Sequence, residues 1–335
     1  MSGATIVTVL GAGSWGSALA IQLARNNVAT YLWGRDAVQM ERMERERRNA
    51  VYLPDITFPE GLRATADLAQ AVTTGSAILV AVPSQAFRAT LRQISPLLKD
   101  GAPLAWATKG FEPGAAKLLH EVVAEELGSA YPTAVISGPT FAAEVARGLP
   151  TAVTVASSNT EVAQFFAGCL HGAAFRAYTS NDVIGVEVGG AVKNVLAIAS
   201  GIADGLGFGA NTRAALITRG LAEMMRLGTA LGAHPETFMG LAGLGDLVLT
   251  CTDDQSRNRR VGLSLGRGHP LDETLRNIGQ AVEGVKSAPE VVRIAREHHT
   301  EMPITEQVYR VLYENRSPQE AVAALLGREP KAELS

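Results

Sequence analysis

The sequence predicts an α/β protein, in which an N-terminal doubly wound sheet is followed by an all-α C-terminal domain. Two observations lead to this prediction. Short apolar runs alternate with helix-like stretches through the first half of the chain, a pattern typical of parallel strands joined by helices. After about residue 181 only helix-like stretches follow. We therefore expect two domains, residues 1–185 and 186–335.

The expected strands are short, and several are nearly all apolar, as in sheets that helices cover on both faces. They occupy residues 5–10, 29–33, 77–83, 103–110, 133–139, 151–157 and 174–180. The helices expected in the second half occupy residues 185–205, 212–232, 287–299 and 305–314, with Gly and Pro between them. No linker rich in Pro or Ser separates the halves, so we expect them to pack closely.

Composition narrows the class of protein. The 335 residues are 47% hydrophobic and 19% charged, which fits a globular chain with a sizeable core. A net charge of −3 gives no positive field for nucleic acid or an anionic membrane. Two cysteines, Cys169 and Cys251, form no disulfide framework, and no metal-binding pattern occurs. We therefore expect a cytoplasmic protein without a metal or a nucleic-acid partner. No uninterrupted apolar run reaches about 18 residues, so we also expect no membrane insertion.

A glycine-rich segment, "GAGSWG" at residues 11–16, follows the first strand and opens a helix. There Gly11 permits a tight turn, Gly13 lets the backbone approach a pyrophosphate, and Gly16 lets helix and strand pack closely. The helix N-terminus offers free N–H groups to phosphates. A turn that serves packing alone is the alternative, but the position in the strand–helix alternation favours a dinucleotide site and a Rossmann-type domain.

The second strand ends in "YLWGRD", which places Arg35 near the position where NAD-binding domains carry an acidic residue. An arginine can pair with a 2′-phosphate, so Arg35 favours NADP. Asp36 lies next to it and leaves NAD open as a second cofactor.

Lys109 ends the apolar strand at 103–110, at the edge of the sheet where ligands bind in such folds. It could hold an anionic ligand or simply emerge into solvent. The segments 81–87 and 137–144 end at the same edge and carry small and hydroxyl residues, among them Thr140.

Lys193 lies in an apolar helical stretch, one turn after Gly189 and Gly190. Glycine inside a helix costs about 1 kcal/mol relative to alanine, which indicates that something approaches this face closely. Lys193 either reaches the surface or is partly desolvated, with a lowered pKa that suits proton transfer near neutral pH.

A glycine-flanked segment, residues 241–262, contains Asp246 followed by several phosphate-binding residue types. These are Ser256, Arg257, Asn258, Arg259 and Arg260. Arginine side chains next to Ser and Asn suit phosphate oxygens, although a solvated loop is the alternative.

The chain resembles the bacterial-type NAD(P)-dependent sn-glycerol-3-phosphate dehydrogenases over nearly its whole length. The motifs "GAGSWGSALA", "VPSQAFR", "ATKGFE", "SGPTFAAEVA", "LAGLGDLVLTC", "SRNRRVG" and "VEGV" occur in the family's order, and the long block around Lys193 is the most specific of all. The resemblance implies a Rossmann-type domain with an all-α domain, as in 6-phosphogluconate dehydrogenase. It also implies reversible NAD(P)H-dependent reduction of dihydroxyacetone phosphate to sn-glycerol 3-phosphate, which supplies glycerophospholipid synthesis.

The resemblance also implies roles for particular residues. Lys193 matches the catalytic proton donor and acceptor, assisted by Lys109 and Asp246. The cofactor positions are Gly11, Gly13, Ser14, Trp15, Gly16, Arg35, Tyr52, Lys109, Ala142, Arg257, Ala281 and Glu283. The substrate positions are Lys109, Gly138, Thr140, Lys193, Asp246, Ser256, Arg257 and Asn258. Thr140 stands where many relatives have Ser, and Ala281 where others have a larger apolar residue.

Two alternatives have other functions. A β-hydroxyacid dehydrogenase shares the two-domain plan but has no use for phosphate-binding residues such as Arg257 and Asn258. A non-catalytic NADP-binding protein would tolerate the loss of Lys193. In each case we expect a homodimer, because closed two-fold dimers are the commonest oligomers.

Overall fold

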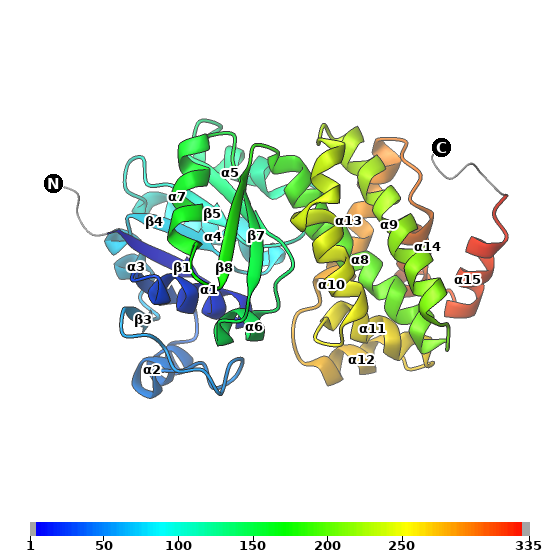
Figure 1. Cartoon of the computed structure of the whole chain (residues 1–335), viewed down its shortest axis with the longest axis horizontal. Coiled ribbons are helices and arrows are strands. Elements are labelled where there is room, and N and C mark those ends of the chain that lie inside the picture. The colour runs from blue at the N-terminus through cyan, green and yellow to red at the C-terminus, as the bar shows by residue number, and fades with distance from the viewer. Residues whose placement is uncertain (1–4, 330–335) are drawn as a thin grey trace.

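The structure is a computed structural model that describes residues 5–329. A half built on a β-sheet and a half built only of helices lie side by side (Figure 1). This arrangement confirms the predicted fold class, in which a sheet domain precedes an all-α domain.

The sheet has eight strands in the order β3-β2-β1-β4-β5-β6-β7-β8. The strands are β1 (Ile6–Leu10), β2 (Ala29–Trp33), β3 (Leu62–Thr65), β4 (Ala77–Val80), β5 (Leu104–Trp106), β6 (Thr133–Ser137), β7 (Thr151–Ala156) and β8 (Phe175–Ser180). The strands β1 to β6 are parallel to one another, so their carboxyl ends share one edge. That edge carries the glycine turn, Lys109 and Gly138.

Two features of the sheet differ from the sequence prediction. The strand β7 runs antiparallel to β6, because the chain turns back through the six-residue helix α6 (Ala142–Arg147) instead of crossing the sheet. The strand β8 then pairs parallel with β7. The edge strand β3 was not predicted, because its four residues alternate between buried and exposed positions and give too short a pattern to detect.

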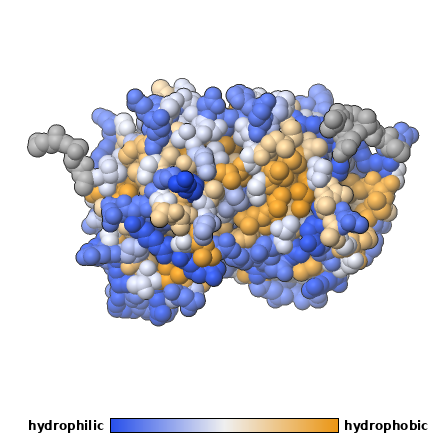
Figure 2. All heavy atoms as spheres, viewed as in Figure 1, coloured by the Kyte–Doolittle hydropathy of each residue, from blue (hydrophilic) through white to orange (hydrophobic). Residues whose placement is uncertain are grey.

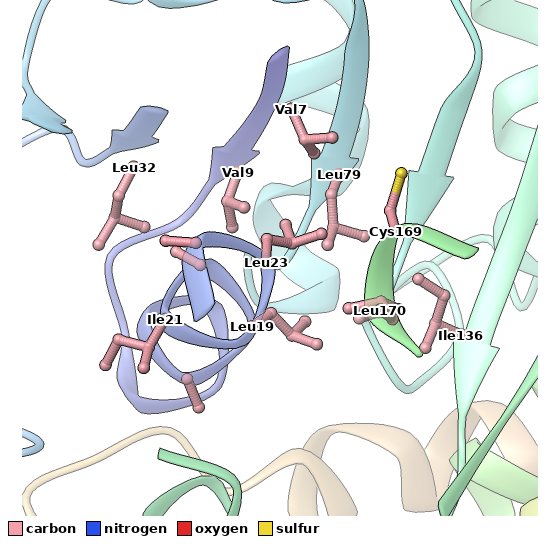
Figure 3. Packing of buried hydrophobic residues seen from close by; sticks show 14 of the residues in the cluster. Val7, Val9, Leu19, Ile21, Leu23, Leu32, Leu79, Ile136, Cys169 and Leu170 are labelled. Atoms are coloured by element: carbon pink, nitrogen blue, oxygen red, sulfur yellow. The ribbon is translucent and has the colours of Figure 1, made fainter. Parts of the chain in front are cut away.

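Helices cover both faces of the sheet. They are α1 (Ser14–Arg25), α2 (Ala37–Glu46), α3 (Leu68–Thr74), α4 (Ser84–Ile94), α5 (Leu119–Leu127), α6 and α7 (Thr160–Leu170), with a 3-10 turn η1 (Ser95–Leu97). Figure 3 shows Leu19 and Leu23 of α1 between the β1 side chains Val7 and Val9 and the end of α7 at Leu170. This packing fixes α1, and therefore the glycine turn at its N-terminus, against the sheet.

The helical half contains the helices expected there and several that were not predicted. It consists of α8 (Val183–Gly205), α9 (Ala210–Ala230), a 3-10 turn η2 (Pro235–Met239), a π-helical turn η3 (Leu241–Gly245), α10 (Asp246–Thr252), α11 (Arg257–Gly266), α12 (Leu271–Ile278), α13 (Glu283–Glu297), α14 (Pro303–Tyr313) and α15 (Pro318–Leu326). The helices α10, α11, α12 and α15 have only 7, 10, 8 and 9 residues, so each gives too short a pattern for a clear helical period.

The long helix α8 is the centre of the helical half. Cβ atoms at Gly201 and Gly262 would overlap backbone atoms of the facing helix, so glycine lets α8 and α11 approach closely. By length and mean hydropathy (1.5) α8 could cross a membrane, but 89% of its apolar window is buried inside the protein, as in a core helix. The predicted domain boundary, between residues 185 and 186, falls within α8, and the division remains a prediction.

Candidate active site

Lys193 lies on the third turn of α8 with its side chain buried. Its Nζ donates to Oδ1 of Asp246 at 2.7 Å and to Oγ1 of Thr250 at 2.8 Å. Asp246 begins α10 and Thr250 lies one turn later on the same face. The prediction that Lys193 is desolvated is therefore confirmed, and the alternative in which its amine reaches the surface is wrong.

Lys109 reaches the same carboxylate from the sheet half. Its Nζ donates to Oδ2 of Asp246 at 2.7 Å and to the carbonyl oxygen of Gly138 at 3.0 Å. The side chain is 15% exposed, so it turns inward and does not simply emerge into solvent. Each oxygen of Asp246 thus accepts from one lysine, and the two lysines come from different halves of the molecule.

Burial and charge shift the pKa values in this centre. Burial lowers the pKa of Lys193, Asp246 raises it and the charge of Lys109 lowers it, with a result of about 8. Burial raises the pKa of Asp246, but the two lysines outweigh burial and leave it below its usual value. Asp246 therefore stays ionised near pH 7, while Lys193 can gain or lose a proton close to neutral pH.

The two glycines before Lys193 have the close neighbours that the sequence indicated. A Cβ at Gly189 would overlap the carbonyl oxygen of Ala242, in the π-helical turn before Asp246. A Cβ at Gly190 would lie 2.9 Å from Oγ of Ser137 and 3.5 Å from Cγ of Lys109. The prediction of a close approach on this face is confirmed. Glycine here lets the two lysines converge on one carboxylate.

Ser256 and Arg257 lie at the start of α11. The Ser256 Oγ accepts from the backbone N–H of Arg259 at 3.2 Å and so caps the helix. Arg257 is half-buried, which lowers its pKa, and its Nη1 donates to Oε1 of Gln280 at a long 3.4 Å. A weakly engaged guanidinium beside a helix N-terminus suits an anionic group.

Asn258 is buried and joins three helices. Its Oδ1 accepts from the backbone N–H of Gly284 at 2.8 Å, and its Nδ2 donates to Oδ1 of Asn194 at 2.8 Å. Asn194 in turn donates to the carbonyl oxygen of Gly190 at 3.1 Å. One Nδ2–H of Asn258 is left for a ligand, while the rest of the amide fixes α11 and α13 against α8.

All three nitrogens of Arg259 already donate to partners inside the protein. Its Nη2 donates to Oδ2 of Asp204 at 2.6 Å, and its other nitrogens pair with Asp254 and the Cys251 carbonyl oxygen. These internal partners hold the guanidinium in place, and a part for Arg259 in a phosphate site stays a prediction. Arg260 is exposed on the far side of the same turn.

The glycine turn has the geometry that a dinucleotide requires. Gly11 has φ +119°, and a Cβ there would lie 2.8 Å from the carbonyl oxygen of Ala81. A Cβ at Gly16 would overlap the carbonyl oxygen of Gly11, whereas nothing lies within 4 Å of a Cβ at Gly13. No side chain caps α1, which begins at Ser14. Open space therefore adjoins free N–H groups.

Comparison with known proteins decides the family. Residues 6–163 match the model of the NAD-dependent glycerol-3-phosphate dehydrogenase N-terminus, and residues 182–323 match that of its C-terminus. The chain belongs to the NAD-dependent glycerol-3-phosphate dehydrogenase family. It is 61% identical over 327 residues to a glycerol-3-phosphate dehydrogenase (NAD(P)+) of Nitrosococcus oceani, covering 98% of this chain and 95% of the relative.

Solved structures agree with this membership. The glycerol-3-phosphate dehydrogenase of Coxiella burnetii superposes with a TM-score of 0.94 at 51% identity, covering 97% of this chain and 99% of that one. A 3-hydroxyisobutyrate dehydrogenase of Salmonella typhimurium, at 17% identity, covers 98% of each chain with a TM-score of 0.50. The second likeness concerns the fold alone.

The glycine turn fits the nicotinamide dinucleotide that glycerol-3-phosphate dehydrogenases of this family use. The space over Gly13 would be filled by a Cβ, and the N–H groups of Ser14 and Trp15 begin an uncapped helix. Nε1 of Trp15 is buried without a hydrogen-bond partner among the described residues. Open space, free N–H groups and an indole N–H without a partner together suit a bound dinucleotide.

Arg35 and Asp36 differ in what they already bind. The Asp36 Oδ1 accepts from the backbone N–H of Gln39 at 3.0 Å and caps α2. Arg35 is exposed and makes no hydrogen bond or ion pair within residues 5–329. The residue that would hold a ribose 2′-hydroxyl is thus engaged, and the residue that suits a 2′-phosphate is available.

Tyr52 is tied to the glycine turn through Asn49. The backbone N–H of Tyr52 donates to Oδ1 of Asn49 at 3.3 Å, and Nδ2 of Asn49 donates to the carbonyl oxygen of Ala12 at 3.1 Å and to Oγ of Ser17 at 2.8 Å. Asn49 is completely buried. The sequence analysis did not identify Asn49, which fixes the turn from outside it.

Gly138, Thr140 and Ala142 form the turn after β6, beside Lys109. Gly138 has φ +151°, and its carbonyl oxygen accepts from Lys109 and from Oγ1 of Thr140, the latter at 3.1 Å. Ala142 begins α6. The predicted residues of this segment therefore adjoin the lysine–aspartate centre.

Glu283 bridges the two halves near Gly110. Its Oε2 accepts from Oγ of Ser84, at the start of α4, at 2.9 Å. Burial raises the pKa of Glu283, although the Ser84 bond and the charge of Arg257 oppose the shift. Ala281 is exposed two residues earlier. Both predicted residues thus lie where α13 meets the sheet half.

Thr250 is a hydrogen-bond partner of Lys193 that the sequence analysis did not identify. Its position four residues after Asp246 would have indicated it, because such residues share a helix face.

No group of three or more His, Cys, Asp or Glu side chains that could hold a metal occurs within residues 5–329.

Proposed function

We propose that this chain catalyses the reversible NAD(P)H-dependent reduction of dihydroxyacetone phosphate to sn-glycerol 3-phosphate. The observation that carries the proposal is the buried Lys193–Asp246–Lys109 centre, in which one lysine has a pKa of about 8. Its family membership, and the names of its relatives at more than half sequence identity, support the same reaction.

The cofactor would be held at the carboxyl edge of the sheet. The backbone of Gly11, Gly13 and Gly16 and the first N–H groups of α1 suit the pyrophosphate. When bound, NAD(P)H supplies the hydride that reduces the substrate carbonyl. Arg35 suits a 2′-phosphate, and we therefore infer a preference for NADPH with some use of NADH.

The remaining cofactor contacts that we infer surround this edge. They are Ser14, Trp15, Tyr52, Lys109, Ala142, Arg257, Ala281 and Glu283.

Lys193 would move the proton. As an ammonium it donates a proton from Nζ to the oxygen that becomes the 2-hydroxyl of the product; as a neutral amine it removes that proton in the oxidative direction. Asp246 holds Nζ of Lys193 and compensates its charge. A pKa near 8 lets both protonation states occur close to neutral pH.

Charged and polar groups around the centre would orient the substrate. Lys109 and the turn at Gly138 and Thr140 face it from the sheet half. Ser256, Arg257 and Asn258, at the N-terminus of α11, suit the phosphate group, since a guanidinium and free N–H groups match phosphate oxygens. Such positioning can lower the barrier by several kcal/mol.

We also propose a cytoplasmic homodimer whose product supplies glycerophospholipid synthesis. Figure 2 shows hydrophobic patches on the visible face of the helical half. Large apolar side chains that are exposed in that half include Phe208, Met239 and Leu326. Exposed apolar patches mark interaction surfaces, so a second copy would pack against this half.

The test is the loss of reduced-nicotinamide absorbance when dihydroxyacetone phosphate is added to the purified protein. NADPH and NADH are run in parallel, and we expect rapid oxidation that is faster with NADPH. A folded protein that binds NADPH but oxidises neither cofactor would overturn the proposal. Turnover with β-hydroxyacids instead would favour that class of dehydrogenase.

A further inference from the structure

Glu187 is a buried carboxylate on α8 that the proposed reaction does not use. It lies six residues before Lys193 on the same helix, and its side chain is 2% exposed. A buried carboxylate requires hydrogen-bond donors, because an uncompensated charge in the interior is very costly. The donors that Glu187 has found all belong to the sheet half.

Two residues supply three hydrogen bonds to Glu187. Its Oε1 accepts from Nε1 of Trp106 at 3.1 Å and from the backbone N–H of His120 at 3.0 Å. Its Oε2 lies 2.5 Å from Nδ1 of His120. An ionised carboxylate only accepts, so Nδ1 of His120 carries the proton. Trp106 is the last residue of β5, and His120 lies in the first turn of α5.

The contacts of α8 with the segment after β5 follow one register. Glu187 of α8 contacts Trp106 at the end of β5. Three residues further along each segment, Gly190 of α8 lies against the aliphatic stem of Lys109. Helix positions three apart share a face, so Glu187 and Gly190 both face the sheet half. The Trp106–Glu187 hydrogen bond therefore fixes which residue of α8 Lys109 passes, and with it the distance of Lys109 from Asp246.

Few charged or titratable groups surround His120 and Lys193, the two groups here that respond to pH. Burial lowers the pKa of His120, but the hydrogen bond and charge of Glu187 and the charge of Glu121 outweigh burial and raise it. Around Lys193 the charged or titratable neighbours are Asp246, Lys109 and Cys251.

We propose that Glu187 is a positioning residue for the proposed reaction: by accepting from Trp106 and His120, it holds α8 in the register in which Lys109 and Lys193 meet on Asp246. The proposal rests on the proposed function for its kinetic readout. Glu187 is the glutamate of "VEVGGAVKN". The role that we propose for it requires no contact with the cofactor or the substrate.

The direct test is Glu187→Gln. The amide keeps the volume and one acceptor oxygen, but it removes the negative charge beside His120 and places an NH2 group against Nδ1. We expect kcat for dihydroxyacetone phosphate reduction to fall by about tenfold or more, since small misplacements in an active site carry large costs. The dissociation constant of NADPH should change much less than kcat, because Lys109 is only one of the proposed cofactor contacts and the glycine turn on β1 and α1 is unaltered.

A shift in the pKa of Lys193 distinguishes positioning from general destabilisation. If Lys109 withdraws from Asp246, its charge no longer lowers the pKa of Lys193, which then rises. The pH profile of glycerol 3-phosphate oxidation should move to higher pH by about half a unit or more. The 13Cε chemical shift of Lys193 in lysine-labelled protein reports the same pKa without any substrate.

Glu223→Gln is the matched control. Glu223 is equally buried and also accepts three hydrogen bonds, from the backbone of Ile304 and from the backbone and Oγ1 of Thr305, but it lies away from Lys193. We expect it to lower the melting temperature and to leave kcat and the pKa of Lys193 unchanged. Trp106→Phe, which removes one donor only, should resemble Glu187→Gln with a smaller effect, and it serves if Glu187→Gln does not fold.

The outcomes separate the two proposals. Wild-type protein without turnover would overturn the proposed function, while the chemical-shift titration still tests the positioning role. Wild-type turnover combined with a Glu187→Gln protein that behaves like Glu223→Gln would overturn the positioning role alone. A raised pKa of Lys193 in Glu187→Gln, absent from Glu223→Gln, would support it.

Discussion

The glycine turn at residues 11–16 consists of backbone groups beside an open space. The centre around Lys193 consists instead of ionised side chains packed in the interior. At the turn, N–H groups without side-chain caps face a volume that a methyl group at Gly13 would enter. At the centre, two lysines share one carboxylate away from water. The turn can therefore be damaged by adding atoms, and the centre by changing charge.

The largest effect is expected from removing the proton donor of the centre. Lys193→Met should lower kcat by about 10²- to 10⁴-fold, the usual contribution of general acid–base catalysis. The affinity for NADPH, measured by fluorescence titration, should be unchanged, because the site that we propose for the cofactor's phosphates is the glycine turn. Near-native turnover would mean that another group moves the proton.

Asp246→Asn should damage stability as well as catalysis. Breaking a buried ion pair costs about 3–5 kcal/mol in the free energy of unfolding, which urea denaturation measures. Loss of the carboxylate also lowers the pKa of Lys193 further, so less ammonium is present at pH 7 and reduction slows. Asp204→Asn removes another buried carboxylate, which pairs with Arg213 and Arg259. It should lower stability while the pH profile stays in place.

Two alanine substitutions at the turn should separate binding from folding. Gly13→Ala should keep the melting temperature but weaken NADPH binding by about 10- to 100-fold, the loss of one or two charge-assisted hydrogen bonds. Gly16→Ala should lower both stability and affinity, because its Cβ overlaps the backbone of Gly11. Equal affinity for NADPH in Gly13→Ala and wild type would contradict the assigned position of the pyrophosphate.

Arg35→Ala should change the choice of cofactor. We expect kcat/KM with NADPH to fall by about tenfold, because one charged hydrogen bond is lost. The value with NADH should be unchanged. Arg42→Ala, an exposed arginine on α2 that pairs with Glu46, is the matched control and should affect neither cofactor. A parallel loss with both cofactors would show that Arg35 does not recognise the 2′-phosphate.

The smallest effect is the dependence of the wild-type rate on pH. Reduction requires the ammonium form of Lys193, and a group with a pKa of about 8 is nine-tenths protonated at pH 7 and half protonated at pH 8. The rate of reduction should therefore fall by about twofold over this interval, while oxidation becomes faster. A flat profile up to pH 10 would indicate an unshifted lysine.

The contrast between the two regions also explains what could be predicted from the sequence. The turn depends on local residues, so the spacing of Gly11, Gly13 and Gly16 after an apolar strand was sufficient to predict it. The centre joins residues up to 137 positions apart, and the spacing within one segment indicates neither the Lys109–Asp246 pair nor the capture of Arg259 by Asp204. The roles assigned to the site residues remain predictions.

The fold shows the same limit. Apolar runs predicted seven of the strands, but no local pattern encodes the direction of β7, which depends on the turn after Gly138. The strand β3 and the helices α10 to α12 have only 4 to 10 residues each, too few for a clear sequence pattern, and tertiary contacts fix them.

The helix α8 serves both cores without a break. Val186 packs with Trp106 and Val135 under the sheet, and Val188 already belongs to the apolar cluster of the helical half. A continuous helix cannot act as a flexible tether, so a change in the angle between the halves would require α8 to bend or its side chains to slide past their neighbours. For the same reason, a fragment that ends before residue 182 would expose the apolar surface of the sheet half that α8 covers in the whole chain. We expect such a fragment to aggregate.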